Sequence, residues 1–175
     1  MKHSSIKAFT LILITCLIAG CGFHLRGQNF ISPKIRAVYL QANDPYSSFT
    51  NTLKETLRSL GIKLVDSPDE APITLKIYHT GFAAQGGATI GSSTTARVIT
   101  FNYTVLFALL DPKGNRLLPP QGITSSGKLN LNPNQLITTN NEVDQLKSNL
   151  QRDAISQMVN ILGSEQVTQM ADKLK

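Results

Sequence analysis

Apolar residues recur along the chain with two spacings, one typical of helices and one typical of strands. The helical spacing of three or four residues first occurs in one stripe, formed by Phe49, Leu53, Leu57 and Leu60. Ser47 or Ser48 can cap the start of this helix, and Gly61 can end it. The pattern therefore predicts an amphipathic helix that runs to Leu60.

A longer helical stripe lies near the C-terminus. Its apolar residues are Val143, Leu146, Leu150, Ala154, Met158 and Ile161. We expect Asn141 to cap this helix, after an Asn-rich loop over residues 130–140, and Gly163 to end it. A short terminal helix is expected to follow, with Val167, Met170 and Leu174 on its apolar side.

Alternating apolar and polar residues predict strands over residues 35–42, 73–78 and 97–110, with a shorter candidate over 62–66. The alternation is longest in residues 97–110. At about 3.3 Å per residue this stretch would span about 46 Å, whereas a usual strand has about 5–6 residues. We therefore expect this strand to project past the sheet or to carry a bulge.

The sequence that follows predicts an antiparallel return. Asp111-Pro112-Lys113-Gly114 fits a type I turn, with Asp first, Pro second and Gly fourth. Proline cannot donate a backbone hydrogen bond to a sheet. Pro119 and Pro120 therefore predict that the returning segment is an edge strand, or that it resumes as a strand over residues 123–131.

The element order is strand, helix, several strands, helix. It predicts an α+β fold in which two amphipathic helices pack on one face of a four-stranded, mixed and mostly antiparallel β-sheet. We expect one domain over residues 35–175, preceded by a tether over 21–34 and a segment over 1–20 that differs in character.

Residues 1–20 are typical of a secretory signal. Lys2 and Lys7 precede an apolar run over residues 8–19, which is too short to cross a hydrocarbon core of about 30 Å. The alternative is an N-terminal core helix or a short membrane anchor. The run ends in Ile18-Ala19-Gly20-Cys21, which resembles the bacterial lipobox, where cleavage precedes a cysteine that receives lipid. We expect Cys21 to carry a covalent lipid anchor.

Composition indicates a polar surface that is mostly uncharged. Charged residues make up 16% of the chain, whereas Ser and Thr number 30 and Asn and Gln number 22. This composition argues against an acidic or basic disordered tail. Removal of Lys2 and Lys7 with the signal leaves 15 basic and 11 acidic residues, a net charge of +4. We expect no nucleic-acid partner across a membrane.

The sequence holds no recognisable catalytic or metal-binding motif. It lacks the HExxH, phosphate-loop, nucleophile-elbow and Cys/His-cluster patterns. His79 is expected to be a surface histidine near a strand end rather than a ligand or a base. We therefore predict no enzyme, no metal site and no cofactor other than the lipid on Cys21.

The stretch from Ile77 to Ala96 contains no charged residue and four glycines. We expect a flexible loop between two strands, either a mobile hairpin tip or a segment that orders against a partner. Lys76 and Arg97 flank it, and Lys128 lies on the returning segment. These three residues are candidates to bind lipid phosphates if a meander brings them to one end of the sheet. Otherwise each is a solvated surface charge.

The expected start of the mature chain, Cys21-Gly22-Phe23-His24-Leu25-Arg26-Gly27, resembles that of the LptE family of lipopolysaccharide-assembly lipoproteins. The similarity continues in order along most of the mature chain. It includes residues 38–40, residues 60–62, residues 100–106 and the Asn-Pro-Asn-Gln stretch before Asn141.

This resemblance implies a non-enzymatic protein with two helices on a four-stranded sheet. It implies that the chain plugs the LptD β-barrel, supports assembly of that barrel and helps to deliver lipopolysaccharide to the outer leaflet. The implied partners are the barrel, lipopolysaccharide and the membrane, and the implied location is the periplasmic side of the outer membrane, within the barrel lumen. Ser, Thr, Asn and Gln suit a polar lumen because they form hydrogen bonds without the desolvation cost of ions.

The alternative interpretation is a free lipoprotein that faces the periplasm. Such a protein would bind another ligand or have a weak hydrolase activity. Either role requires a concave pocket with convergent polar groups.

Overall fold

The structure is a computed structural model of the 175-residue chain. It describes residue 31 and residues 35–89, 97–131 and 136–172. The predicted signal over residues 1–20, the lipid anchor Cys21 and almost all of the tether over 21–34 lie outside the described residues. The inferences on these segments therefore stay predictions.

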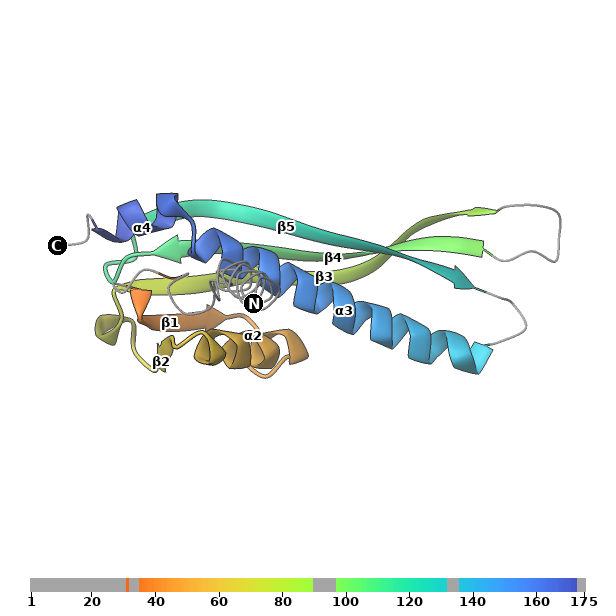
Figure 1. Cartoon of the computed structure of the whole chain (residues 1–175), viewed down its shortest axis with the longest axis horizontal. Coiled ribbons are helices and arrows are strands. Elements are labelled where there is room, and N and C mark those ends of the chain that lie inside the picture. The colour runs from red at the N-terminus through yellow and green to blue at the C-terminus, as the bar shows by residue number, and fades with distance from the viewer. Residues whose placement is uncertain (1–30, 32–34, 90–96, 132–135, 173–175) are drawn as a thin grey trace, which may run out of the picture.

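The described chain forms a two-layer α+β domain with helices on one face of a mixed sheet (Figure 1). The strands are β1 (Ala37–Ala42), β2 (Lys63–Val65), β3 (Ile73–Thr89), β4 (Arg97–Leu110) and β5 (Arg116–Leu131). Their order in the sheet is β2-β1-β3-β4-β5. β1 is parallel to β2 and β3, and the other pairs are antiparallel.

The predicted fold class is confirmed, but the sheet has five strands rather than four. The additional strand is β2, the short candidate over residues 62–66, which pairs in register with β1 from Lys63 to Val65. A 3₁₀ helix, η2 (Pro68–Glu70), links it to β3. A three-residue segment is too short for a clear alternation of apolar and polar residues. It can therefore be identified as a strand only from its pairing with β1.

The first helix, α2 (Ser48–Ser59), confirms the predicted stripe and caps. The Ser47 side chain accepts a hydrogen bond from the Thr50 backbone N–H at 3.1 Å. Gly61 follows the helix with φ +79°, a left-handed conformation that glycine adopts without strain. The predicted apolar side chains face the sheet, and those that are buried are Phe49, Leu53 and Leu57.

The second helix, α3 (Leu136–Leu162), starts five residues before the predicted cap at Asn141. Residues 136–140 are therefore helical, and the predicted loop over 130–140 is wrong for them. Asn lowers helix propensity only modestly, by well under 1 kcal/mol per residue. A helix of 27 residues is about 40 Å long, which matches the strands beneath it. A terminal helix, α4 (Glu165–Asp172), follows as expected.

The expected loop from Ile77 onward is largely strand. β3 continues to Thr89 and pairs with β4 from His79↔Leu106 to Gln85↔Thr100. The backbone of the long strand β4 needs hydrogen-bond partners on both sides, and this uncharged segment supplies one side. The remaining residues of the expected loop, 90–96, lie outside the described residues.

The antiparallel return is confirmed. The Gly114 N–H donates to the Asp111 carbonyl at 3.0 Å, and Gly114 has φ +85°. β5 is an edge strand, as predicted, and Pro119 and Pro120 lie within it where the register with β4 is irregular.

The core lies between the helices and the sheet. Alternate residues of β4 enter it, and the most buried of these are Phe101, Tyr103, Val105, Phe107 and Leu109. α3 approaches β5 closely at Gly127, where a Cβ atom would lie 2.7 Å from Leu146 Cδ1. No helix in the described residues is both long and apolar enough to span a membrane.

The molecule is elongated because three strands and one helix continue past the rest (Figure 1). We call the projecting part the arm: β3 from His79, β4 up to Leu106, β5 from Gly122 and the first half of α3. The base comprises β1, β2, α2, α4 and the remaining parts of the longer elements. β4 passes through both, which confirms that this strand projects past the sheet of the base.

Candidate functional site: the arm and its junction with the base

One face of the arm sheet is covered by α3, and the opposite face carries mostly uncharged polar side chains. The strand registers align on this open face Gln85, Thr100, Asn102, Thr104, Thr124 and Ser126, with Lys128 opposite Thr100 toward the far end. Asn102 Nδ2 donates to Gln85 Oε1 at 2.8 Å. Asn102 Oδ1 is buried and has no hydrogen-bond partner among the described residues. The open face therefore consists mostly of neutral hydrogen-bonding groups, but Asn102 Oδ1 itself is not accessible to an external partner in this conformation.

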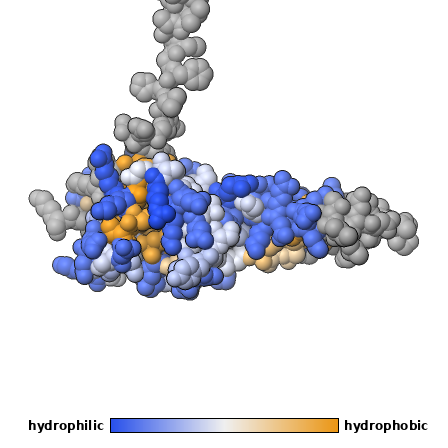
Figure 2. Space-filling model, turned by 90° about the horizontal axis from the view of Figure 1, so that it is seen from below, coloured by the Kyte–Doolittle hydropathy of each residue, from blue (hydrophilic) through white to orange (hydrophobic). Residues whose placement is uncertain are grey.

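Figure 2 shows how polarity is distributed over the surface seen from below. Hydrophobic surface is concentrated on the base, whereas the arm is largely hydrophilic with one weaker hydrophobic area. The arm is thus exposed along its length without a broad apolar surface on this side.

The three basic residues selected from the sequence do not come together. Arg97 pairs with Thr89 and Leu131, and Lys128 pairs with Thr100, three positions further along β4. Lys76 pairs with Ala108 in the base. At about 3.3 Å per residue, Lys76 lies about 26 Å from the register position of Lys128.

The expectation that all three share one end of the sheet is therefore wrong for Lys76. The strands form the expected meander, but they are much longer than the segment that was predicted for β3. Lys76 Nζ instead lies 5.2 Å from the ring centroid of its neighbour Tyr78. Only Arg97 and Lys128 lie near the far end of the arm.

An aromatic cluster fills the junction between arm and base. The rings of Phe82 and Phe101 stack with centroids 5.3 Å apart, and those of Phe49 and Tyr103 lie 6.0 Å apart. Burial raises the pKa of the Tyr103 hydroxyl, and its hydrogen bond with the Thr80 side chain acts in the opposite direction. These rings join α2, β3 and β4 where β1 ends.

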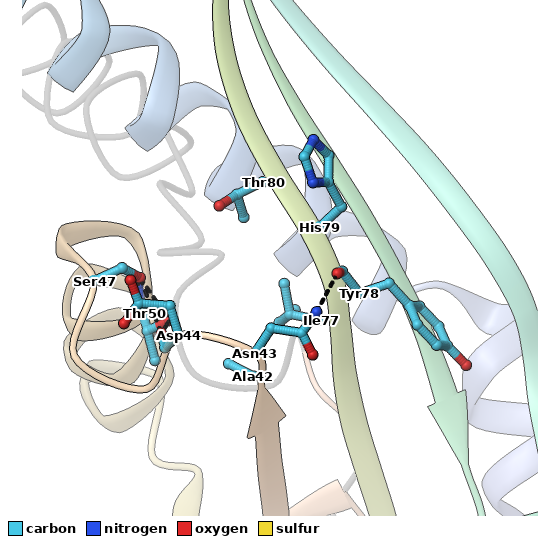
Figure 3. A pocket seen from close by; sticks show the side chains of 9 residues that line it. All are labelled: Ala42, Asn43, Asp44, Ser47, Thr50, Ile77, Tyr78, His79 and Thr80. Atoms are coloured by element: carbon cyan, nitrogen blue, oxygen red, sulfur yellow. Dashed lines mark hydrogen bonds between the residues drawn. The ribbon is translucent and has the colours of Figure 1, made fainter.

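Two pockets flank the start of the arm. One, of about 300 Å³, has walls from α2, β3, β4 and α3 and a mixed lining. Its residues are Ser47, Ser48, Phe49, Thr80, Gly81, Phe82, Tyr103, Lys147 and Gln151. Lys147 Nζ lies 5.8 Å from the Phe82 ring centroid, so a cation stands at the rim of an aromatic wall. The other pocket, of about 240 Å³, lies between the end of β1, the start of α2 and β3 (Figure 3).

The turn between β1 and α2 is held by hydrogen bonds to backbone carbonyls. Thr50 Oγ1 donates to the Asp44 carbonyl at 2.7 Å, and Lys54 Nζ donates to the Pro45 carbonyl at 3.2 Å. The Tyr46 N–H donates to Asp44 Oδ1 at 3.1 Å. Tyr46 is 88% exposed, so this rigid turn presents an aromatic ring to solvent beside the pockets.

His79 lies on an exposed part of β3 at the smaller pocket, as expected for a surface histidine. His79 and Thr80 leave the strand on opposite sides (Figure 3). The His79 ring lies against Gly81, where a Cβ atom would approach its Nε2 to 2.9 Å. The described residues contain no group of three His, Cys, Asp or Glu side chains arranged to hold a metal ion.

Comparison with known proteins supplies the family. The family model described as "LptE: Lipopolysaccharide-assembly" matches residues 35–162, which cover almost all of the described domain. The chain belongs to the LptE family.

Curated LptE proteins are similar in sequence. One from Pectobacterium atrosepticum, named LPS-assembly lipoprotein LptE, is 27% identical over 95% of this chain and 91% of the relative. A protein of the same name from Yersinia enterocolitica is 35% identical over 49% of this chain and 47% of the relative.

Solved structures of two lipoproteins share the fold of this LptE-family chain. Lipoprotein B from Nitrosomonas europaea superposes with a TM-score of 0.66 at 24% identity, over 79% of this chain and 88% of that one. The rare lipoprotein B from Shewanella oneidensis gives a TM-score of 0.66 at 19% identity, over 76% of this chain and 98% of that one. At these identities the similarity shows the fold alone.

Sequence reasoning on this LptE-family chain missed the junction pockets and the exposed edge of β3. The signal was present in the weak alternation of Phe82 and Ala84 with Gly81, Ala83 and Gln85. Small residues and glycine conceal such an alternation, because they are common in loops as well as in strands.

Proposed function

We propose that this LptE-family protein is a non-enzymatic lipoprotein of the outer membrane, anchored by lipid on Cys21. The protein lies on the periplasmic side of this membrane and occupies the lumen of an LptD-type β-barrel. There it supports assembly of the barrel and takes part in delivering lipopolysaccharide to the outer leaflet. The observation that carries this proposal is the family match over residues 35–162, joined to relatives named as LPS-assembly lipoproteins.

The dimensions of the arm support a place inside a large barrel. Three strands about 4.8 Å apart and a helix layer about 10 Å from the sheet give a cross-section on the order of 20 Å. Barrels of about 8 strands are filled by their own side chains, whereas those of about 16 strands or more leave a channel or hold a plug. The arm therefore requires a barrel of the larger kind.

The open face of the arm supports the same placement. The side chains aligned across it, such as Thr100, Asn102 and Thr124, are neutral donors and acceptors of hydrogen bonds. The interior of a large outer-membrane barrel is polar and contains water. Neutral polar groups can exchange water for wall contacts at a lower desolvation cost than charges.

Arg97 and Lys128 are the residues that we assign to lipopolysaccharide within this proposal. They lie near the far end of the arm, and their separation by three register positions places them on opposite faces of the sheet. Each would therefore bind a phosphate separately, by charge-assisted hydrogen bonds. Lys76 was a third candidate from the sequence, but its place in the base separates it from this pair.

The alternative, a free ligand-binding or hydrolytic lipoprotein, requires a well-formed pocket. The junction pockets have volumes of about 240 and 300 Å³. Ligand sites occupy about 300–1,000 Å³, so these pockets are at or below the lower limit. The geometry therefore favours an interaction subunit.

Purification from outer membranes tests the proposal. The full chain with its own signal and a C-terminal affinity tag is expressed in a Gram-negative host and extracted in mild detergent. We expect a large outer-membrane β-barrel to co-purify in a stable complex, identified by mass spectrometry. Recovery of the protein without any barrel would contradict the proposed function.

A Cys21→Ser variant tests the anchor separately. It is expressed without the barrel partner, beside the unaltered chain, and both are separated into membrane and soluble fractions. We expect the unaltered chain in membranes and the variant in the soluble fraction, because the lipid would be its membrane attachment. Equal partition of both into membranes would refute lipid anchoring at Cys21.

A further inference from the structure

The sheet has three edges that are free of a strand partner in the described residues, and two of them are protected. β2 forms one outer edge and is only three residues long, with Lys63 at its start. β5 forms the other and carries Pro119, Pro120 and Lys128. Short strands, proline and lysine are the usual means by which proteins prevent unwanted pairing at a sheet edge.

The third edge belongs to β3 in the arm, and it lacks these protections. β1 pairs with β3 only up to Ile77, so from His79 onward β3 has no partner on that side among the described residues. The segment His79–Gln85 pairs regularly with β4 between two register shifts, so its pairing is uninterrupted over seven residues. We call the side of this segment that faces away from β4 the free edge.

The free edge is exposed and uncharged. His79, Ala83, Ala84 and Gln85 are exposed, and β3 contains no charged residue after Lys76. An unprotected edge of this kind presents a row of unpaired N–H and C=O groups, which is a template for another strand. Pairing there would bury no charge, so its desolvation cost is low.

The start of the free edge already shows how its hydrogen-bonding groups are satisfied. β1 ends at Ala42, and the side chain of the next residue, Asn43, donates from Nδ2 to the Tyr78 carbonyl at 2.8 Å (Figure 3). A side chain thus replaces the backbone donor that β1 no longer supplies. Beyond Tyr78 no strand of the described residues continues this line along β3.

The larger junction pocket lies beside this line. Thr80, Gly81 and Phe82 of β3 form one wall, and Phe49 and Tyr103 add aromatic surface. A strand that continued the line of β1 would direct alternate side chains to this side of the sheet. The pocket can receive one side chain of such a strand, with aromatic rings on one side and polar groups, including Lys147 at its rim, on the other.

We propose that an extended segment of the barrel partner pairs with the free edge of β3 over His79–Gln85 as an additional strand, with one of its side chains in the 300 Å³ pocket. This mode of recognition uses backbone hydrogen bonds for affinity and a side-chain pocket for specificity. The proposal rests on the proposed function, because the barrel is the partner that would supply the segment.

Hydrogen exchange at single-residue resolution tests the pairing directly. The full protein is measured alone and in its co-purified barrel complex. In the protein alone, every second amide of His79–Gln85 should exchange quickly, since only alternate N–H groups point away from β4. In the complex these fast amides should slow on the order of 100-fold or more, while the outward amides of β5 stay fast.

Two matched variants test the same site through affinity. Ala83→Lys with Ala84→Lys places charges on the free edge, and Gln166→Lys with Gln169→Lys places the same charges on exposed positions of α4 in the base. We expect the first pair to reduce barrel recovery about tenfold, as lysine opposes edge pairing. The second pair should change recovery by no more than about twofold.

The outcomes separate this inference from the proposed function. A stable barrel complex in which the outward amides of His79–Gln85 exchange as fast as in the protein alone overturns the strand pairing and leaves the function standing. Failure to recover any barrel overturns both. Protection that appears in the protein alone as its concentration rises would assign the edge to a second copy of this chain, and would also overturn the proposal.

Discussion

Gln151 connects the two main helices at the scale of a single residue. It lies on α3 with 5% of its surface exposed, and its Nε2 donates to Ser48 Oγ at 3.3 Å and to Thr52 Oγ1 at 3.2 Å on α2. A buried amide is stable only with such partners, because an unpaired polar group costs about 1–3 kcal/mol. These hydrogen bonds fix the position of α3 relative to α2, which the apolar contacts alone specify less precisely.

Replacement of this side chain should weaken the contact between the helices. Gln151→Ala is expected to lower the free energy of unfolding by about 1–2 kcal/mol, through lost hydrogen bonds and a small cavity. Urea denaturation measures the change, and Gln145→Ala at an exposed position of α3 serves as the control. Equal stability of the two variants would show that the buried amide contributes nothing.

At the scale of a single element, the turn of the β4–β5 hairpin depends on the side chain of Asp111. The turn at its end is held by Asp111, whose Oδ1 accepts from the Asn115 backbone N–H at 2.7 Å and whose Oδ2 accepts from Asn115 Nδ2 at 2.8 Å. The side-chain hydrogen bond from Asn115 is the main reason that the pKa of Asp111 lies below its ordinary value of 3.8. The charged form of Asp111 therefore favours the folded turn.

This lowered pKa predicts a pH dependence with a definite sign. The stabilisation by Asp111 should be fully present above the unfolded pKa and should disappear as the pH falls through the lowered folded value. In thermal unfolding from about pH 7 to about pH 2, the difference in melting temperature between the unaltered protein and Asp111→Asn should shrink only below about pH 4. A difference that grows on acidification would have the wrong sign and would refute this role.

Other elements of the fold depend on one another for their length. β4 runs for 14 residues because β3 and β5 supply partners along it, and α3 covers the resulting surface. The close approach of α3 to β5 requires Gly127, whose missing side chain leaves room for Leu146 and Leu150. The arm is therefore a cooperative unit of three strands and a helix.

At the scale of the whole molecule, base and arm have different surfaces. The base carries Lys76 and the concentrated hydrophobic surface seen in Figure 2. The arm carries the free edge and the mostly uncharged open face, with Lys128 on that face toward its far end. The positions of Lys76 and Lys128 along the sheet differ by about 26 Å. A ligand bound at the far end would contact only one of these two lysines.

Binding of lipopolysaccharide should therefore distinguish the two lysines. Lys128→Gln is expected to weaken binding about two- to fivefold at low salt, the effect of one exposed charge pair of about 0.5–1 kcal/mol. Lys76→Gln, the matched control in the base, should leave the affinity unchanged. Titration of fluorescently labelled lipopolysaccharide measures both, and an equal loss in the two variants would argue against a site at the far end of the arm.

The sequence by itself determined the local features of this protein. The stripe and caps of α2, the bounds of β4 and the turn at Asp111–Gly114 were all predicted correctly. Each depends on residues within a few positions of one another, so spacing and turn chemistry are sufficient to specify it.

Only the tertiary structure decided the features that depend on pairing over long sequence distances. The extension of β3 to Thr89, the early start of α3 at Leu136 and the strand character of Lys63–Val65 all follow from partners elsewhere in the chain. The separation of Lys76 from Lys128 and the free edge of β3 follow in turn from these lengths. The physical reason is that a strand gains its hydrogen bonds from other strands, which local sequence does not specify.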